Sequence, residues 1–83
     1  MNVQVRYFAS VREAMGCEAE TVQTQATTVG ALRQELCARS DTHAQALAPE
    51  RALRAALNHQ MCEPSAALRE GAEVAFFPPV TGG

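Results

Sequence analysis

The sequence contains no lysine, although it carries seven basic residues, all of them arginine. Chemistry that needs a side-chain amine on this protein is therefore excluded. Basic charge is scarce as well, because nine acidic residues give a formal net charge of −2. Without a basic field, neither a nucleic acid nor an anionic membrane surface is expected as a partner.

Tryptophan is also absent, and the other aromatic side chains are few, with three Phe and one Tyr. A chain of 83 residues has the size of one domain. Such a domain buries only about 60 to 65% of the surface that its unfolded chain exposes. Each large apolar side chain therefore matters individually to the core.

Long hydrophobic runs are missing too. No run approaches the length of a membrane span, and the residues after Met1 lack the charged and apolar regions of a signal peptide. We therefore expect a cytoplasmic location. The cysteines are odd in number and have no Cys-x-x-Cys spacing, which favours reduced thiols over a disulfide framework or a metal site. They are Cys17, Cys37 and Cys62.

The N-terminal part shows the alternation of a strand with one buried face. Alternate side chains of residues 3–7 are apolar and predicted to face the core, which places Phe8 on the outer face. A short helical turn over residues 9–15 then leads into a second strand over residues 18–24. In that strand the candidates for burial are Ala19, Thr21 and Val22.

Helical spacing follows in the middle of the chain. Thr28 is a suitable N-cap, and the apolar stripe after it predicts a helix over residues 29–39. Ser40 and Asp41 are expected to cap a second short helix over residues 42–48.

Three more strands are predicted after the helices. The third covers residues 53–57, a brief fourth begins at Met61, and the last covers residues 73–77. In the last strand alternation turns Phe76 toward the core and Phe77 to the other side. This order of elements is that of an α+β domain, in which a mixed sheet wraps over one main helix and the first and last strands lie parallel at the centre.

The chain ends in a stiff and slender tail. Pro78 and Pro79 end the last strand, because proline has no N–H for the ladder and fixes φ. We therefore predict a domain over residues 1–77 and an extended tail over residues 78–83, which reaches about 20 Å and ends in a carboxylate. Beyond the prolines the tail consists of small or β-branched residues, Val80, Thr81, Gly82 and Gly83.

This order of elements with an exposed Gly-Gly end resembles the β-grasp fold of ubiquitin-like sulfur carriers, and in particular the small subunits of molybdopterin synthase. The most specific part is EVAFFPPVTGG at residues 73–83. VRYFA at residues 5–9 and the start of the main helix support the resemblance. It extends over the whole chain.

The resemblance implies a carrier of sulfur that is not itself an enzyme. A carboxylate is a poor electrophile at neutral pH, so Gly83 would first be adenylated by an E1-like adenylyltransferase with ATP. A sulfur donor would then convert the acyl-adenylate to a thiocarboxylate. The large catalytic subunit of molybdopterin synthase, in a heterotetramer, would deliver this sulfur to a cyclic pterin precursor of the molybdenum cofactor. No bound cofactor is expected, because the activating partner consumes the ATP.

Docking to such partners needs a surface, and the alternation of side chains along the strands predicts where it lies. Phe8 and Phe77 are expected on one outward face, and Met61 is expected to join them from the fourth strand. Exposed aromatic and Met side chains that gather together mark interfaces. Arg12 is expected to supply a polar rim.

Other classes of function stay open. A Cys nucleophile with His43 or His59 as its base would make the chain an enzyme, but no motif supports this, and both histidines are expected in solvent. A ubiquitin-like modifier joined to other proteins through Gly83 is a second alternative. A sulfur carrier for thiazole biosynthesis is a third, although the segment FFPP at residues 76–79 favours the pterin pathway.

Overall fold

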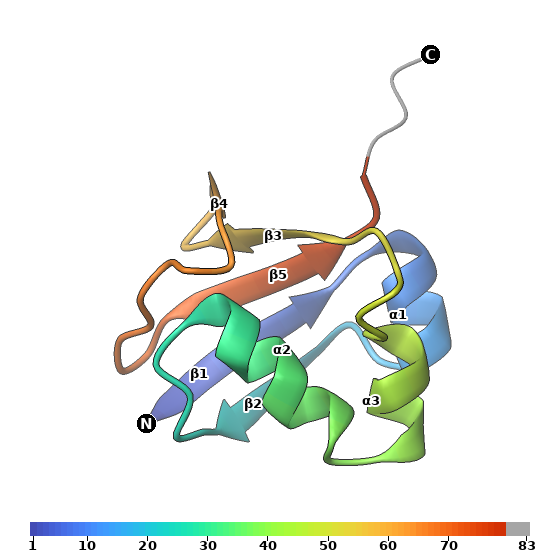
Figure 1. Cartoon of the computed structure of the whole chain (residues 1–83), viewed down its shortest axis with the longest axis horizontal. Helices are drawn as coiled ribbons and strands as arrows, with labels where there is room; N and C mark the ends of the chain where they lie inside the picture. Colours follow the sequence, from blue (N-terminus) through green and yellow to red (C-terminus); the bar gives the residue numbers. More distant parts are fainter. Residues whose placement is uncertain (80–83) are drawn as a thin grey trace.

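The computed structural model describes residues 1–79, and Figure 1 labels their helices and strands. Within these residues one mixed sheet has the strand order β2-β1-β5-β3-β4. The central strands β1 and β5 are parallel, whereas the other neighbours are antiparallel. This confirms the predicted β-grasp arrangement. In chain order the elements are β1 (Asn2–Tyr7), α1 (Ala9–Met15), β2 (Ala19–Gln23), α2 (Val29–Cys37), α3 (Asp41–Ala46), β3 (Arg54–Leu57), β4 (Gln60–Cys62) and β5 (Glu73–Phe77).

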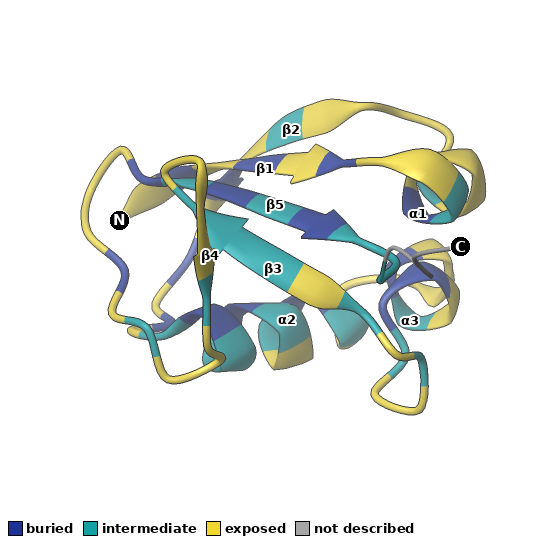
Figure 2. Cartoon of the chain, turned by 90° about the horizontal axis from the view of Figure 1, so that it is seen from above, coloured by how far each residue is buried: buried dark blue, intermediate teal, exposed yellow. Residues whose placement is uncertain are grey.

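Helix α2 lies across one face of the sheet, while α1 and α3 close the end at which β1 and β5 finish (Figure 2). The space between these layers holds the core. None of the helices within residues 1–79 has the length and apolar character needed to cross a membrane. The largest fully buried side chains are Tyr7, Phe76, Leu32, Leu36, Leu47, Val3, Val5, Val11, Val22, Val29 and Val74.

Strand β1 shows the predicted alternation, since every second side chain is buried and the others are exposed. Its parallel register with β5 sets Val5 opposite Val74 and Tyr7 opposite Phe76. Phe76 is accordingly 2% exposed, whereas Phe77 is half-buried on the other face. The predicted register of the last strand is therefore confirmed.

The predicted burial in the second strand was wrong for two residues. Ala19 and Thr21 are exposed, and only Val22 of the three candidates is buried. The reason is the pairing with β1, which sets Val22 opposite the core residue Val3 and Glu20 opposite Val5. Paired residues share a face of the sheet, so Glu20 points toward the helices.

Helix α2 begins as predicted at its cap and ends earlier than predicted, at Cys37. The Thr28 hydroxyl accepts a hydrogen bond from the N–H of Ala31 (3.1 Å). The Gly30 N–H donates to the Pro64 carbonyl (2.8 Å), and a Cβ at position 30 would lie only 3.1 Å from Pro64 Cβ. A glycine that weakens the first helical turn thus permits this close approach of the loop.

The short strands β3 and β4 form a hairpin with a two-residue turn. Asn58 and His59 both have positive φ, 49° and 70°, which is the conformation of the turns that suit the twist of paired strands. Leu57 and Gln60 face each other across the turn. The hairpin thereby turns Met61 onto the same face as its partner, Ala56.

Candidate functional site

The last strand leads directly into the segment that is predicted to form the tail. Strand β5 ends at Phe77, and the half-buried Pro78 and Pro79 follow it. Because β5 lies between β1 and β3, the chain leaves from the middle of the sheet and not from its edge. The rest of the predicted tail, Val80, Thr81, Gly82 and Gly83, lies outside the described residues.

A first row of side chains crosses the outer face of the sheet beside this exit. Phe8 follows β1 in an extended conformation, is 44% exposed, and donates its N–H to the Phe76 carbonyl (3.2 Å). Phe77 comes next, and its partner on β3 is Arg54. Because paired residues share a face, Phe77 and Arg54 lie on the side opposite to Phe76. Because Phe8 continues the extended backbone after Tyr7, it lies on the same face as Phe77, as parity predicts.

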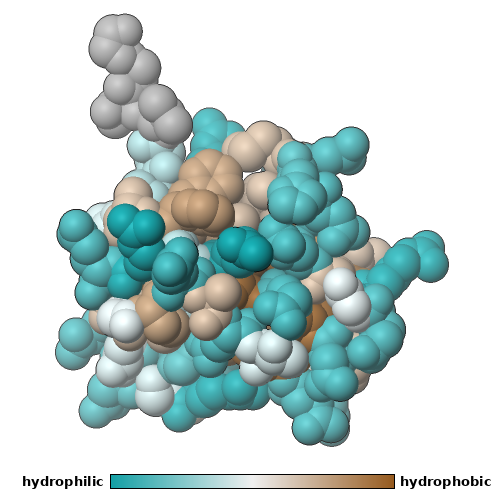
Figure 3. Space-filling model, turned by 180° about the vertical axis from the view of Figure 1, so that it is seen from behind, coloured by the Kyte–Doolittle hydropathy of each residue, from teal (hydrophilic) through white to brown (hydrophobic). Residues whose placement is uncertain are grey.

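A second row runs parallel to the first, with Ala75 and Ala56 between Arg6 and Met61. Met61 is 60% exposed and the two alanines are half-buried. Figure 3 looks onto the side opposite α2 and shows hydrophobic surface gathered near the point where the described chain ends. We call this surface the outer apolar face, which consists of Phe8, Ala56, Met61, Ala75 and Phe77.

Charged side chains border the outer apolar face. Glu73 Oε2 lies 3.4 Å from Arg6 Nε, and His59 Nε2 lies 3.4 Å from the same oxygen. The His59 side chain is 80% exposed, as predicted. Arg12 lies exposed on α1, and Arg54 is exposed beside Phe77. Such exposed ion pairs contribute little to stability, but they set the charge that a partner meets.

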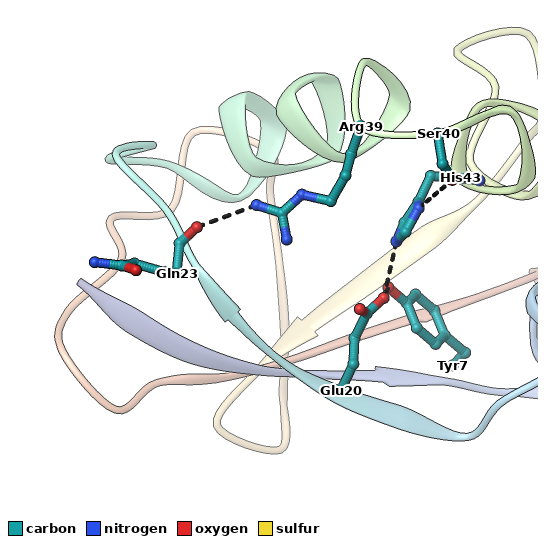
Figure 4. A network of polar contacts seen from close by, with 6 residues as sticks. All are labelled: Tyr7, Glu20, Gln23, Arg39, Ser40 and His43. Atoms are coloured by element: carbon teal, nitrogen blue, oxygen red, sulfur yellow. Dashed lines mark hydrogen bonds and ion pairs between the residues drawn. The ribbon is translucent and has the colours of Figure 1, made fainter.

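A second polar cluster lies on the other side of the sheet, among the helices (Figure 4). The Tyr7 hydroxyl donates to Glu20 Oε2 (2.6 Å), and His43 Nε2 donates to the same oxygen (2.9 Å). Ser40 caps α3 by accepting from the His43 N–H (3.1 Å), and its hydroxyl lies 2.7 Å from His43 Nδ1. The cluster ties β1, β2 and α3 together. Close by, Arg39 donates to the Gln23 carbonyl (3.1 Å).

This cluster corrects the prediction that His43 is solvated, because only 9% of that residue is exposed. Burial raises the pKa of the Tyr7 hydroxyl, and the hydrogen bond to Glu20 raises it further. Burial also acts to raise the pKa of the Glu20 carboxyl, but hydrogen bonds from Tyr7 and His43 bring it below its ordinary value. The cluster is closed on itself and lies on the face of the sheet opposite to Phe77, so we regard it as structural.

The two shifts predict a stability plateau with two limits. Glu20 has a depressed pKa in the folded state, so its contribution is present above about pH 4.5 and is lost as the pH falls further. Tyr7 has a raised pKa, so its contribution is present below pH 10 and is lost as the pH rises above it. Each group changes the free energy of unfolding by at most about 1.4 kcal/mol per pH unit.

Urea unfolding curves recorded at intervals of about one pH unit, from roughly pH 3 to pH 11, would measure this plateau. We expect Glu20→Gln to flatten the acid limb and Tyr7→Phe to flatten the alkaline limb. Glu13→Gln is the matched control, because Glu13 is an exposed carboxylate on α1 with no ion pair to a described residue. An acid limb that is equally steep in all variants would contradict the assignment to Glu20.

Within residues 1–79 no cysteine forms a hydrogen bond with a histidine. Cys37 Sγ donates to the Leu47 carbonyl (3.2 Å), and Cys62 Sγ lies 3.7 Å from the Ala55 carbonyl. Burial raises the pKa of the Cys62 thiol, which is opposite to what a nucleophile needs. Cys17 is exposed. In the described part of the chain no group of three potential ligands is placed to hold a metal ion.

Comparisons with known proteins bear on the whole chain. The model of the ThiS family matches residues 5–83. The chain is 47% identical over 81 residues to the molybdopterin synthase sulfur carrier subunit of Escherichia coli, covering 98% of this chain and 99% of that protein. Among solved structures it is similar to SAMP1 from Haloferax volcanii, with 25% identity, a TM-score of 0.78 and full coverage of both chains. It is also similar to a chain in the complex of subunits 1 and 2 of the molybdopterin-converting factor from Helicobacter pylori, with 25% identity, a TM-score of 0.68 and full coverage of both chains.

Proposed function

The chain belongs to the ThiS family, and from that premise we propose that it is the sulfur carrier subunit of a molybdopterin synthase. The observation that carries the proposal is the 47% identity to a protein of that name over nearly the full length of both chains. The fold is consistent with this role, because β5 passes beside an exposed apolar face immediately before the tail begins.

In this role Gly83 is the reacting residue. Its carboxylate attacks the α-phosphorus of ATP on an E1-like adenylyltransferase, so that pyrophosphate leaves and an acyl-adenylate forms. Sulfide supplied by a sulfur donor then adds to the carbonyl carbon, AMP leaves with the C–O bond of the anhydride broken, and the terminus becomes a thiocarboxylate. The activation is needed because a carboxylate is a poor electrophile at neutral pH. The chain consumes no cofactor of its own, and the catalytic groups belong to its partners.

The third step takes place on the large subunit of the synthase, which receives the tail and presents a cyclic pterin precursor to the thiocarboxylate sulfur. The solved complex of subunits 1 and 2 of the Helicobacter pylori factor supports a partner of this kind. We place the contact on the outer apolar face, with Phe8, Phe77 and Met61 as anchors and Arg12 at the rim. The prolines Pro78 and Pro79 stiffen the start of the tail, which lowers the entropy lost when it enters a channel.

Intact-mass spectrometry tests the proposal on protein incubated with its activating enzyme, ATP and a sulfur source. We expect a fraction of the protein to carry one sulfur atom in place of one terminal oxygen. A free carboxylate under all such conditions would contradict the carrier function.

Two further observations separate the alternatives. Gly83 recovered in isopeptide linkage to lysines of other proteins would favour a protein modifier. A thiocarboxylate that is consumed in thiazole synthesis, and not by the large synthase subunit, would favour the thiazole pathway.

A further inference from the structure

Arg54 differs from Arg6, its neighbour on the outer face, because no acid of the described chain neutralises it. Arg6 lies 3.4 Å from the Glu73 carboxylate, which also faces His59. The Arg54 side chain is exposed and forms no ion pair with any residue in the range 1–79. Its cross-strand partner is Phe77, the last residue before the prolines. A free guanidinium therefore stands next to an apolar anchor at the tail exit.

Any protein that covers Phe77 must also meet Arg54. Removing the water around a guanidinium by covering it with apolar surface costs much free energy, unless an anion takes the place of the water. The planar fork of arginine matches a carboxylate in a bidentate pair, which fixes an angle as well as a distance. Glu73 cannot serve, because it already pairs with Arg6 and lies at the other end of β5.

We propose that the surface that receives the tail carries an Asp or Glu carboxylate opposite Arg54, next to an apolar pocket for Phe77. The pair sets the direction in which the tail leaves the domain, because Arg54 and Phe77 face each other across β3 and β5 immediately before Pro78. Arg54 is thus a specificity-determining residue of the docking surface. This inference rests on the proposed function.

The test measures the affinity of the full-length chain for the large subunit of molybdopterin synthase from the same organism, at low and at high salt. We expect Arg54→Glu to weaken binding roughly tenfold or more at low salt, and by less at high salt. Arg54→Lys should give an intermediate loss of affinity, because lysine keeps the positive charge but lacks the planar pair of N–H donors that binds a carboxylate in a bidentate manner. Arg69→Glu is the matched control, since Arg69 is exposed and precedes β5 at the end of the sheet away from Phe77.

The outcomes separate this inference from the proposed function. If Arg54→Glu and Arg69→Glu behave alike while Phe77→Ala weakens binding, only the carboxylate opposite Arg54 is rejected. If the wild-type chain does not bind the large subunit, the proposed partner is rejected and this inference with it. Thermal unfolding of each variant accompanies the binding data, and Arg54→Gln replaces Arg54→Glu if the charge reversal lowers stability.

Discussion

Deletion of Gly83 is expected to abolish sulfur transfer to the pterin precursor and to leave thermal unfolding of the domain unchanged. The terminal carboxyl group would then fall about 3.3 Å short of the reacting position, one residue of extended chain. A displacement of even about 1 Å can reduce a reaction rate roughly 100-fold. The buried core found within residues 1–79 extends no further along the chain than Phe76, so folding does not depend on the last residue.

The measurement is the sulfuration of the pterin precursor by the reconstituted synthase, with a melting curve of the carrier alone. One residue added after Gly83 should have the same effect, because it moves the carboxylate beyond the reacting position. Glu13→Gln is an internal control that alters an exposed side chain on α1 and should transfer sulfur at the wild-type rate. Full activity in the shortened or the extended chain would show that the terminal carboxylate is not the reacting group.

Much of the fold is predictable because its first central strand, β1, alternates unambiguously between polar and apolar residues. In β1 the inward positions are Val or Tyr and the outward positions are polar, so one register alone buries the apolar set. In β5 Val74 and Phe76 are buried, and the parallel pairing with β1 gives them the inner face although Ala75 and Phe77 on the other face are apolar too. The positions of Phe8 and Phe77 follow from these two strands. The outer apolar face was therefore accessible from sequence.

The second strand could not be predicted in the same way. Its two faces carry Ala19 and Thr21 on one side and Glu20 and Val22 on the other, so neither side is clearly apolar. Glu20 turns inward because the hydroxyl of Tyr7 and the ring of a distant histidine satisfy its carboxylate. That histidine lies on a different element, and no local pattern relates the two positions.

Which charges on the outer face are paired could not be predicted from the sequence either. The difference between the neutralised Arg6 and the free Arg54 depends on the cross-strand register of β1, β3 and β5. Short strands such as β3 do not reveal their register by alternation, because Ala55 and Ala56 are alike. Only the assembled sheet shows which arginine already has a carboxylate.

Truncation of the neighbouring residues Phe76 and Phe77 to alanine is expected to separate folding from binding. Phe76 is 2% exposed and lies opposite Tyr7, so Phe76→Ala should lower the free energy of unfolding by about 3 to 5 kcal/mol. A domain of this size has a total stability of roughly 5 to 15 kcal/mol, so this loss is severe. At temperatures where the variant remains folded, its affinity for the large subunit should stay near that of the wild type.

Phe77 is half-buried on the outer apolar face, and Phe77→Ala should cost only about 1 kcal/mol of folding free energy. If the side chain is an anchor of the docking surface, the same change should cost about 2 kcal/mol of binding free energy, roughly a thirtyfold loss of affinity. The paired measurement is urea unfolding and affinity for the large subunit with each variant. Phe8→Ala extends the series, since Phe8 lies beside Phe77 and is 44% exposed.

The contrast is informative because the two side chains are identical and adjacent, so composition and position in the sequence cannot explain a difference. Only the face of the sheet differs between them, which the register of β5 with β1 and β3 determines. Equal losses of affinity in both variants, each in proportion to lost stability, would mean that binding reports folding alone. The outer apolar face would then not be the surface that meets the large subunit, and the search for the docking site would move to α1 and the tail.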